Sequence, residues 1–110
     1  ELHGEAFNFG PPAQQNHSVI ELVKEMSLSW SEVRWEESKS KSSEFYESGL
    51  LKLNCDKALH YLDWYAVLSF QETVALTASW YKAYYEDPTS IRLITDKQIS
   101  EYSNRLKFFT

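Results

Sequence analysis

The chain has 110 residues, of which 43% are hydrophobic and 15% aromatic, and its formal net charge is −5. This length suits one domain, and the apolar fraction is enough to form a core. The acidic balance argues against a nucleic-acid-binding protein, which needs clustered lysines and arginines. No apolar run approaches the roughly 18 residues of a transmembrane helix, so we expect no membrane span.

The cysteine content and the first residue indicate the compartment and the origin of the chain. Cys55 is the single cysteine, which excludes an internal disulfide and fits a reducing compartment, so we expect a cytoplasmic protein. The chain begins with Glu1 rather than methionine, so we expect that it was processed or belongs to a larger protein. Aromatic residues at this density form either a compact core or a face that packs on another domain.

Two short strands and one helix are predicted in the first third of the chain. Residues 5–9 alternate weakly and are partly aromatic, which indicates a strand. Ser18 and Glu21 form a capping box, which predicts the start of a helix. The apolar face of this helix comprises Val19, Leu22, Val23, Met26 and Trp30. Val33 and Trp35 alternate with charged residues, which indicates a second strand.

The middle of the chain contains a predicted loop, followed by a segment whose secondary structure is not predicted. Residues 38–43 form a short polar cluster of serines and lysines, which predicts a mobile loop. Residues 44–48 (Glu-Phe-Tyr-Glu-Ser) follow, and a carboxylate and a phenol between two strands can bind the hydroxyl groups of a sugar or a base. A purely structural role is the alternative. Leu51 and Leu53 then alternate with polar residues, which predicts a third strand.

A short helix and a turn are expected after this strand. Cys55 or Asp56 caps the helix, which continues through Leu62. Residues 63–65 offer no helical face to continue it, so we expect a turn whose Trp64 packs into the core.

A long amphipathic helix is predicted next. Ser69 and Glu72 form a second capping box at its start. It ends at Asp87, because the following proline has no N–H and disfavours helix in the residue before it. The apolar arc of this helix comprises Phe70, Val74, Thr77, Ala78, Trp80, Tyr81, Tyr84 and Tyr85.

A connector at residues 89–93 leads to the last predicted element. Thr95 and Gln98 form a third capping-box pattern, and the closing helix has a stripe of Ile99, Tyr102 and Leu106. Together the elements indicate a mostly helical α+β domain with about four helices and a few short strands. These strands are too few and too short for a self-sufficient sheet, which indicates a partner domain.

For most candidate catalytic or metal-binding residues, the sequence favours an ordinary structural or solvent-exposed role. Cys55, at a strand-to-helix junction, fits a structural role better than that of a nucleophile. The Glu36-Glu37 pair lies beside a lysine- and serine-rich loop and is expected to be solvated. Neither a glycine-rich phosphate loop nor a Tyr-x-x-x-Lys pair occurs in the sequence. A metal site is not expected, because no ligand spacing joins the three histidines, His3, His17 and His60.

Several short motifs nevertheless occur in a fixed order: Asn8-Phe9-Gly10, Leu51-x-Leu53, Lys57-Ala58, Leu62-x-Trp64 and Trp80-Tyr81. In this order they resemble the C-terminal part of the CDP-glucose 4,6-dehydratases, which belong to the extended short-chain dehydrogenase/reductase family. The likeness covers almost the whole chain, from about Gly4 to Tyr102. The Lys-Ala and Leu-x-Trp motifs are shared with epimerases and other dehydratases. The Trp-Tyr pair and the later Thr95-x-x-Gln98-Ile99 favour the CDP-glucose branch.

The chain departs from the family pattern at several positions. Tyr46-Glu47-Ser48 stands where the family usually has His-Glu-Ala, and Asn54 stands where an aspartate is common. In the family's Leu-Gly-Trp-x-Pro motif, Asp63 replaces the glycine and Ala66 the proline. A residue with a side chain therefore takes this turn, with a positive φ that aspartate tolerates.

The resemblance implies a nucleotide-sugar-binding domain that works with an N-terminal Rossmann domain outside this sequence. In the family, that domain binds NAD and carries the Tyr-x-x-x-Lys pair, and the enzyme converts CDP-glucose to CDP-4-keto-6-deoxyglucose in bacterial deoxysugar and O-antigen biosynthesis. Residues 1–110 are then the substrate domain, inactive alone, without catalytic, cofactor or metal residues. Tyr46 and Glu47 match the family's substrate contacts. The implied partners are the nucleotide sugar and the Rossmann domain, and homo-oligomerisation is left open.

Two alternatives fit the same pattern. Another nucleotide-sugar epimerase or dehydratase of the family has a similar C-terminal part and would prefer a UDP- or GDP-sugar. A free-standing interaction module would keep the fold without the chemistry and would dock or dimerise through an apolar face.

Overall fold

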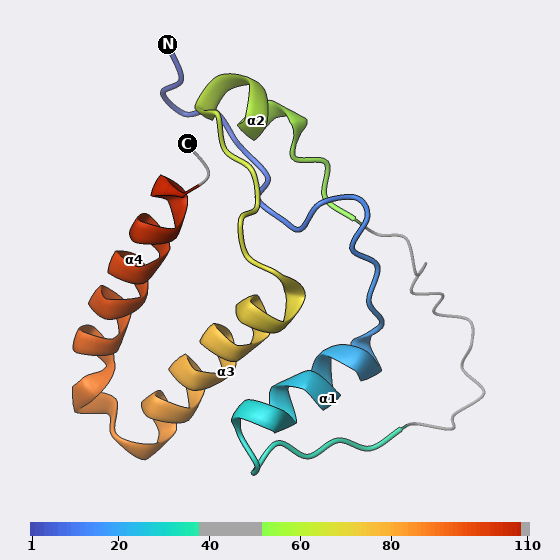
Figure 1. The fold of residues 1–110 in the computed structure, drawn as a ribbon, viewed down its shortest axis with the longest axis vertical. Helices are drawn as coiled ribbons and strands as arrows, with labels where there is room; N and C mark the ends of the chain where they lie inside the picture. The colour runs from blue at the N-terminus through green and yellow to red at the C-terminus, as the bar shows by residue number, and fades with distance from the viewer. Residues whose placement is uncertain (38–51, 109–110) are drawn as a thin grey trace. The chain divides into compact units, whose positions relative to one another are not determined.

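The computed structural model describes residues 1–37 and 52–108, which form four α-helices and one 3₁₀ helix (Figure 1). Their bounds are α1 (Val19–Ser29), α2 (Asp56–Leu62), α3 (Phe70–Glu86), η1 (Pro88–Ser90) and α4 (Ile91–Lys107). Backbone contacts divide the chain into two units, Glu1–Asn16 with Ser38–Ala66 and His17–Glu37 with Val67–Thr110. None of the helices in the described ranges is long and apolar enough to cross a bilayer.

The described residues are mostly helical and contain four α-helices, as predicted, but they contain no β-strand, so the α+β part of the predicted class is corrected. The strands predicted at residues 5–9 and 33–36 are wrong, and residues 52–54 of the third are not a strand either. A strand needs a neighbour that accepts its backbone hydrogen bonds. After α1 the backbone closes a local turn instead, in which the Val33 amide donates to the Trp30 carbonyl at 3.1 Å. The loop predicted at residues 38–43 lies outside the described residues.

The helix α1 begins where the capping box predicts. The Glu21 amide donates to the Ser18 hydroxyl at 3.2 Å, and the Ser18 amide donates to the Glu21 carboxylate at 3.2 Å. Its covered face is narrower than predicted, because Val19 is 61% exposed and Leu22 is 39% exposed. The half-buried side chains include Ile20, Val23, Met26 and Trp30.

The helix α3 is the central element of the second unit. The predicted capping box of Ser69 and Glu72 is confirmed, and the helix ends at its C-cap residue Asp87 as predicted. Val74 and Ala78 are buried and lie one turn apart, so they share a face of the helix. The C-terminal part of the predicted apolar arc is much more open, with exposed fractions of 45%, 45% and 68% for Tyr81, Tyr84 and Tyr85.

The helices α1 and α3 run parallel (Figure 1). Where both helices begin, the rings of His17 and Phe70 stack with their centroids 3.8 Å apart. Where both helices end, the rings of Trp30 and Tyr85 stack with their centroids 5.7 Å apart. The C-termini of these two helices therefore lie at the same end of the pair.

The helix α4 runs antiparallel to α3 and is joined to it by polar side chains. The Trp80 indole N–H donates to the Thr95 hydroxyl at 2.8 Å, and the Gln98 amide donates to the Leu76 carbonyl at 2.9 Å. The capping box predicted at Thr95 is wrong, because α4 begins one turn earlier at Ile91. The Thr95 hydroxyl instead donates to the Ile91 carbonyl inside the helix, and η1 occupies part of the predicted connector.

Candidate functional site

The two substrate contacts that the resemblance implies, Tyr46 and Glu47, lie outside the described residues. The structure does describe the other motifs of the first unit that carry the resemblance. These are the segment of residues 5–10, here called the N-terminal strap, and the region from residue 52 to residue 64.

The strap contacts the second set of motifs through side chains. The Asn8 amide donates to the Asn54 carbonyl at 3.4 Å, across a separation of 46 residues. The Phe9 ring meets the Trp64 ring edge to face, with centroids 4.9 Å apart and planes at 88°. This geometry is a favoured arrangement of two aromatic rings. Trp64 is half-buried, which confirms only in part the prediction that it packs into the core.

Gly10 lies where the strap passes the residues before α2. A Cβ atom added at Gly10 would meet the Leu53 side chain at 3.5 Å and the Cys55 sulfur at 3.6 Å. These are ordinary van der Waals distances, so the described neighbours leave room for a methyl group. Close approach to these neighbours therefore does not explain why the motif has a glycine.

Lys57, in the first turn of α2, forms an ion pair and a cation–π contact with the strap. Its ammonium group lies 2.7 Å from the Glu5 carboxylate and 4.9 Å from the centroid of the Phe7 ring. The pKa of Glu5 is lowered because its carboxylate accepts this hydrogen bond and lies beside a positive charge. The adjacent Ala58 is completely buried. Within the described residues, Ala58 of the Lys-Ala motif thus packs in the interior, and Lys57 forms an exposed ion pair with Glu5.

The helix α2 begins after Cys55 and ends at Asp63. At the start, the Asn54 side chain accepts the Asp56 amide at 2.8 Å, whereas Cys55 makes no side-chain cap. Cys55 is the N-cap residue of α2, as predicted, but the side-chain hydrogen bond at this end comes from Asn54. At the end, Asp63 has a φ of 50° and its amide donates to the Ala58 carbonyl. The predicted positive φ at Asp63 is confirmed, since this residue takes the left-handed turn.

Two of the histidines, His17 and His60, have ring contacts. The ring of His17 stacks on Phe70, and its Nδ1 lies 3.0 Å from the Glu21 carboxylate. The ring of His60, in the last turn of α2, meets the Tyr61 ring edge to face. In the described ranges, no group of three or more His, Cys, Asp or Glu side chains could hold a metal ion.

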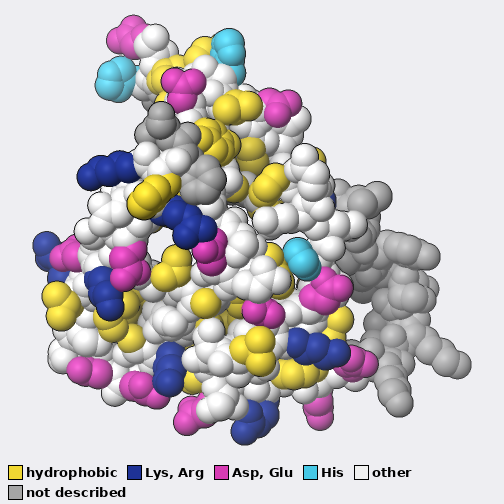
Figure 2. Space-filling view, viewed as in Figure 1, with side chains coloured by type: hydrophobic (Ala, Val, Ile, Leu, Met, Phe, Trp, Pro, Cys, Tyr) yellow, Lys and Arg dark blue, Asp and Glu magenta, His cyan; other side chains and the backbone are white. Residues whose placement is uncertain are grey.

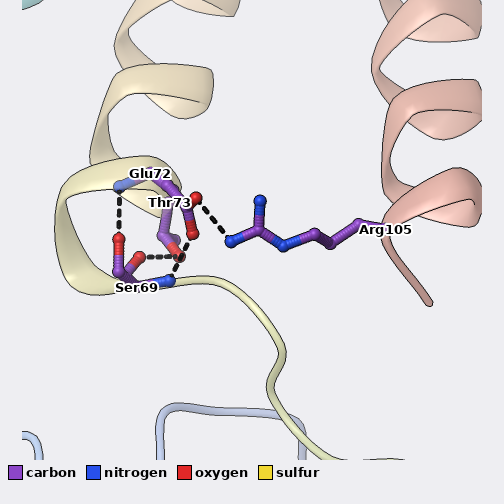
Figure 3. A network of polar contacts seen from close by, with 4 residues as sticks. All are labelled: Ser69, Glu72, Thr73 and Arg105. Carbon is purple, nitrogen blue, oxygen red and sulfur yellow. Dashed lines mark hydrogen bonds and ion pairs between the residues drawn. The ribbon is translucent and has the colours of Figure 1, made fainter. Parts of the chain in front are cut away.

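A polar network fixes the end of α4 to the start of α3 (Figure 3). One Glu72 oxygen accepts the Ser69 amide at 2.8 Å, and the other accepts the Arg105 guanidinium at 2.6 Å. The Thr73 hydroxyl donates to the Ser69 carbonyl at 2.9 Å. The pKa of Glu72 is lowered, first by the hydrogen bond from the Ser69 backbone and then by the one from Arg105.

The sequence interpretation missed the face of α4 that contacts α3. Three polar residues of this face follow one another at intervals of three and seven positions: Thr95, Gln98 and Arg105. These intervals place them on one side of a helix, so the signal was present. It was hidden because a contact face is normally recognised by apolar residues.

No protein-family model matches the chain, and neither the curated proteins nor the solved structures include a match. The likeness to the CDP-glucose 4,6-dehydratases therefore depends on the ordered sequence motifs alone.

Proposed function

We propose that the chain is the nucleotide-sugar-binding part of a CDP-glucose 4,6-dehydratase. The observation that carries the proposal is that motifs far apart in the sequence contact one another in one unit. Asn8 and Phe9 of the first motif meet Asn54 and Trp64 of the later ones. Residues that pack together in this way are expected to occur together, in the same order, in related chains.

The proposal divides the chemistry between this chain and a domain outside it. NAD, when bound, would take up a hydride from the sugar and return it. A dinucleotide is held by a glycine-rich turn at a helix N-terminus, and the glycines Gly4, Gly10 and Gly49 do not form such a motif. The proposal therefore assigns NAD to a Rossmann domain. This chain would bind and orient the nucleotide sugar, with Tyr46 and Glu47 as its contacts.

The test uses the protein isolated from its source at its natural length. It is incubated with NAD and CDP-glucose, and in parallel with UDP-glucose and GDP-mannose, and the products are analysed by mass spectrometry. We expect the loss of one water from CDP-glucose in preference to the other two. Preferred turnover of a UDP- or GDP-sugar would instead assign the protein to another member of the family.

Matched variants test the two proposed contacts. Tyr46→Phe and Glu47→Gln should raise KM for CDP-glucose more than they lower kcat, because each removes a hydrogen-bonding group from substrate binding. Tyr61→Phe is the control, since Tyr61 is an exposed tyrosine on α2 whose recorded ring partner is His60. An unchanged KM in both site variants would remove Tyr46 and Glu47 from the site.

The open apolar surface favours a second candidate, a non-catalytic interaction module. Figure 2 shows hydrophobic side chains at many places on one face of the molecule, between acidic and basic ones. No large side chain among the described residues is fully buried. A natural protein with a mass near 12.9 kDa and no turnover of any sugar nucleotide would support this candidate over the first. Saturable NAD binding by the 110-residue chain would contradict both.

A further inference from the structure

The helix α3 is the middle helix of the second unit, and two of its sides are covered by no other helix of this unit. Among the described helices of the unit, α1 and α4 each contact α3 but not each other, so the three helices form a single layer (Figure 1). A domain normally buries its apolar surface between two layers. The open sides of α3 are therefore where a second layer would pack.

One of these sides carries four uncharged side chains, here called the Thr–Tyr stripe: Thr73, Thr77, Tyr81 and Tyr84. Intervals of four, four and three residues place them on one side of the helix. All four are exposed, and each tyrosine is 45% exposed. The opposite side of α3 is polar and holds Gln71, Ser79 and Lys82. This amphipathic pattern indicates that the stripe, and not the opposite side, meets a partner.

The two threonines of the stripe have their hydroxyl donors satisfied inside the helix. The Thr73 hydroxyl donates to the Ser69 carbonyl at 2.9 Å, and the Thr77 hydroxyl donates to the Thr73 carbonyl at 2.8 Å. Neither threonine therefore needs a polar partner outside α3. An apolar surface can cover both of them without leaving a buried donor unpaired.

The two tyrosine rings of the stripe are held by Trp80. The Tyr84 and Trp80 rings are nearly parallel, with centroids 5.7 Å apart, and the Tyr81 ring meets Trp80 edge to face at 5.3 Å. The Trp80 indole N–H is itself bound to the Thr95 hydroxyl of α4. Rings fixed in this way lose little side-chain freedom when a partner covers them. The stripe is therefore arranged before any partner binds.

The order of small and large residues along the stripe indicates which partner fits it. The two threonines lie in the N-terminal half of α3 and the two tyrosines in its C-terminal half. Two stripes packed antiparallel, with Thr77 of both copies at the centre, place Tyr81 of each copy over Thr73 of the other. Large side chains then meet small ones, which is how facing helices fill the space between them. Parallel packing would instead set tyrosine against tyrosine.

We propose that the Thr–Tyr stripe is a self-association surface, at which two copies of this chain pack with their α3 helices antiparallel. A two-fold axis brings the same patch of both copies into contact, so the patch must complement itself. The order of threonines and tyrosines meets this requirement. The stripe has no charged residue, so the net charge of −5 on each copy does not place like charges at its centre. This inference does not depend on the proposed dehydratase function.

The area of the stripe sets the expected strength of the dimer. A tyrosine that is 45% exposed offers roughly 100 Å² of surface. The four side chains together therefore cover less than the about 800 Å² per chain of a standard interface. We expect a weak dimer, with a Kd on the order of 0.1 mM.

The test is sedimentation equilibrium of the full chain from about 10 µM to about 1 mM, with two-dimensional NMR of the ¹⁵N-labelled chain over the same range. We expect the average mass to rise from 12.9 kDa towards that of a dimer. The amides of the stripe should shift as the concentration rises. A mass of 12.9 kDa at every concentration, or shifts confined to other residues, would overturn the proposal.

Position 77 gives the sharpest test, because it meets its own counterpart at the two-fold axis. Thr77→Glu and Thr77→Lys each bring two like charges together and should weaken self-association more than about ten-fold. An equimolar mixture of these two variants brings opposite charges together and should recover association as mixed pairs. Ser79→Glu and Ser79→Lys are the matched controls, because Ser79 is exposed on the opposite side of α3. Both should associate as the unchanged chain does.

The mixture separates loss of the contact from loss of the fold. Thr77 is exposed, and glutamate and lysine are good helix formers, so we expect both variants to keep the far-ultraviolet circular dichroism of the unchanged chain. A mixture that stays monomeric would contradict the antiparallel pairing. Controls at position 79 that weaken association as much as the variants at position 77 would place the contact elsewhere and overturn the proposal.

Discussion

The Arg105 guanidinium donates to the Glu72 carboxylate at 2.6 Å and so joins the last turn of α4 to the first turn of α3. The other oxygen of the same carboxylate accepts the Ser69 amide in the capping box. The Glu72 side chain therefore both caps the N-terminus of α3 and links α3 to α4 (Figure 3). Because each role needs the ionised carboxylate, local helix stability and helix packing respond together to its protonation.

The first prediction concerns the pH dependence of stability. The pKa of Glu72 is lower in the folded chain than its ordinary value. Its stabilising contribution is thus fully present above the unfolded pKa, about 4.3, and is lost as the pH falls through the folded pKa. We expect the urea midpoint to fall as the pH is lowered from about 5 to about 3, and Glu72→Gln to reduce that slope.

The control for this prediction is Glu101→Gln. Glu101 forms an exposed pair with Lys97 at 4.0 Å on α4, and such pairs contribute little to stability. Its removal should leave the slope close to that of the unchanged chain. The prediction is wrong if Glu72→Gln and Glu101→Gln give the same pH profile.

The second prediction concerns Thr95, which accepts the Trp80 indole N–H at 2.8 Å. Thr95→Val keeps the shape of the side chain but leaves this donor without a partner, which should reduce the free energy of unfolding by about 1–2 kcal/mol. Thr95→Ser keeps the hydroxyl group and should recover most of the loss. Urea unfolding followed by tryptophan fluorescence measures both variants, and equal losses in the two would show that the hydroxyl is unimportant.

The helices could be predicted from the sequence because their signals are local. The capping boxes at Ser18 and Ser69, and the proline after Asp87, act over three or four residues and do not depend on the rest of the chain. The positive φ of Asp63 was predicted from the resemblance instead, because a glycine usually takes this turn in the family pattern. At these positions the local preference and the observed structure agree.

The strands could not be predicted, and the contact face of α4 was missed, because both depend on partners far away in the sequence. Alternation in residues 5–9 is compatible with a strand, but a strand forms only where another segment pairs with it. Thr95 and Gln98 match a capping box by spacing, yet their real partners are Trp80 and Leu76 on another helix. The sequence-predicted contacts Tyr46 and Glu47 lie outside the described residues and stay a prediction.

The third prediction uses the left-handed turn at Asp63. Its φ of 50° is readily adopted by glycine and is costly for a β-branched residue. Asp63→Gly should leave the free energy of unfolding unchanged or raise it by up to about 1 kcal/mol, whereas Asp63→Val should lower it by about 1–2 kcal/mol. Thermal unfolding of the two variants measures the difference. A valine variant as stable as the glycine variant would contradict the backbone argument.

The fourth prediction compares two glycines of the first unit. Gly4 has a φ of 77°, where an alanine is strained, although no described atom beyond its two chain neighbours lies within 4 Å of an added Cβ. Gly10 has room for a Cβ at ordinary contact distances from Leu53 and Cys55. We expect Gly10→Ala to change the free energy of unfolding by less than about 0.5 kcal/mol. Gly4→Ala should open the turn in which the Glu5 amide donates to the Leu2 carbonyl at 3.2 Å.

Hydrogen exchange of the Glu5 amide, measured by NMR, separates the two glycine variants. Exchange should become faster in Gly4→Ala and stay unchanged in Gly10→Ala, because only the first substitution acts on the backbone of that turn. Gly10→Leu is the steric control, since its larger side chain exceeds the space beside Leu53 and Cys55 and should destabilise the strap. If Gly10→Ala were as disruptive as Gly10→Leu, the glycine would be required for a reason other than contact with these two residues.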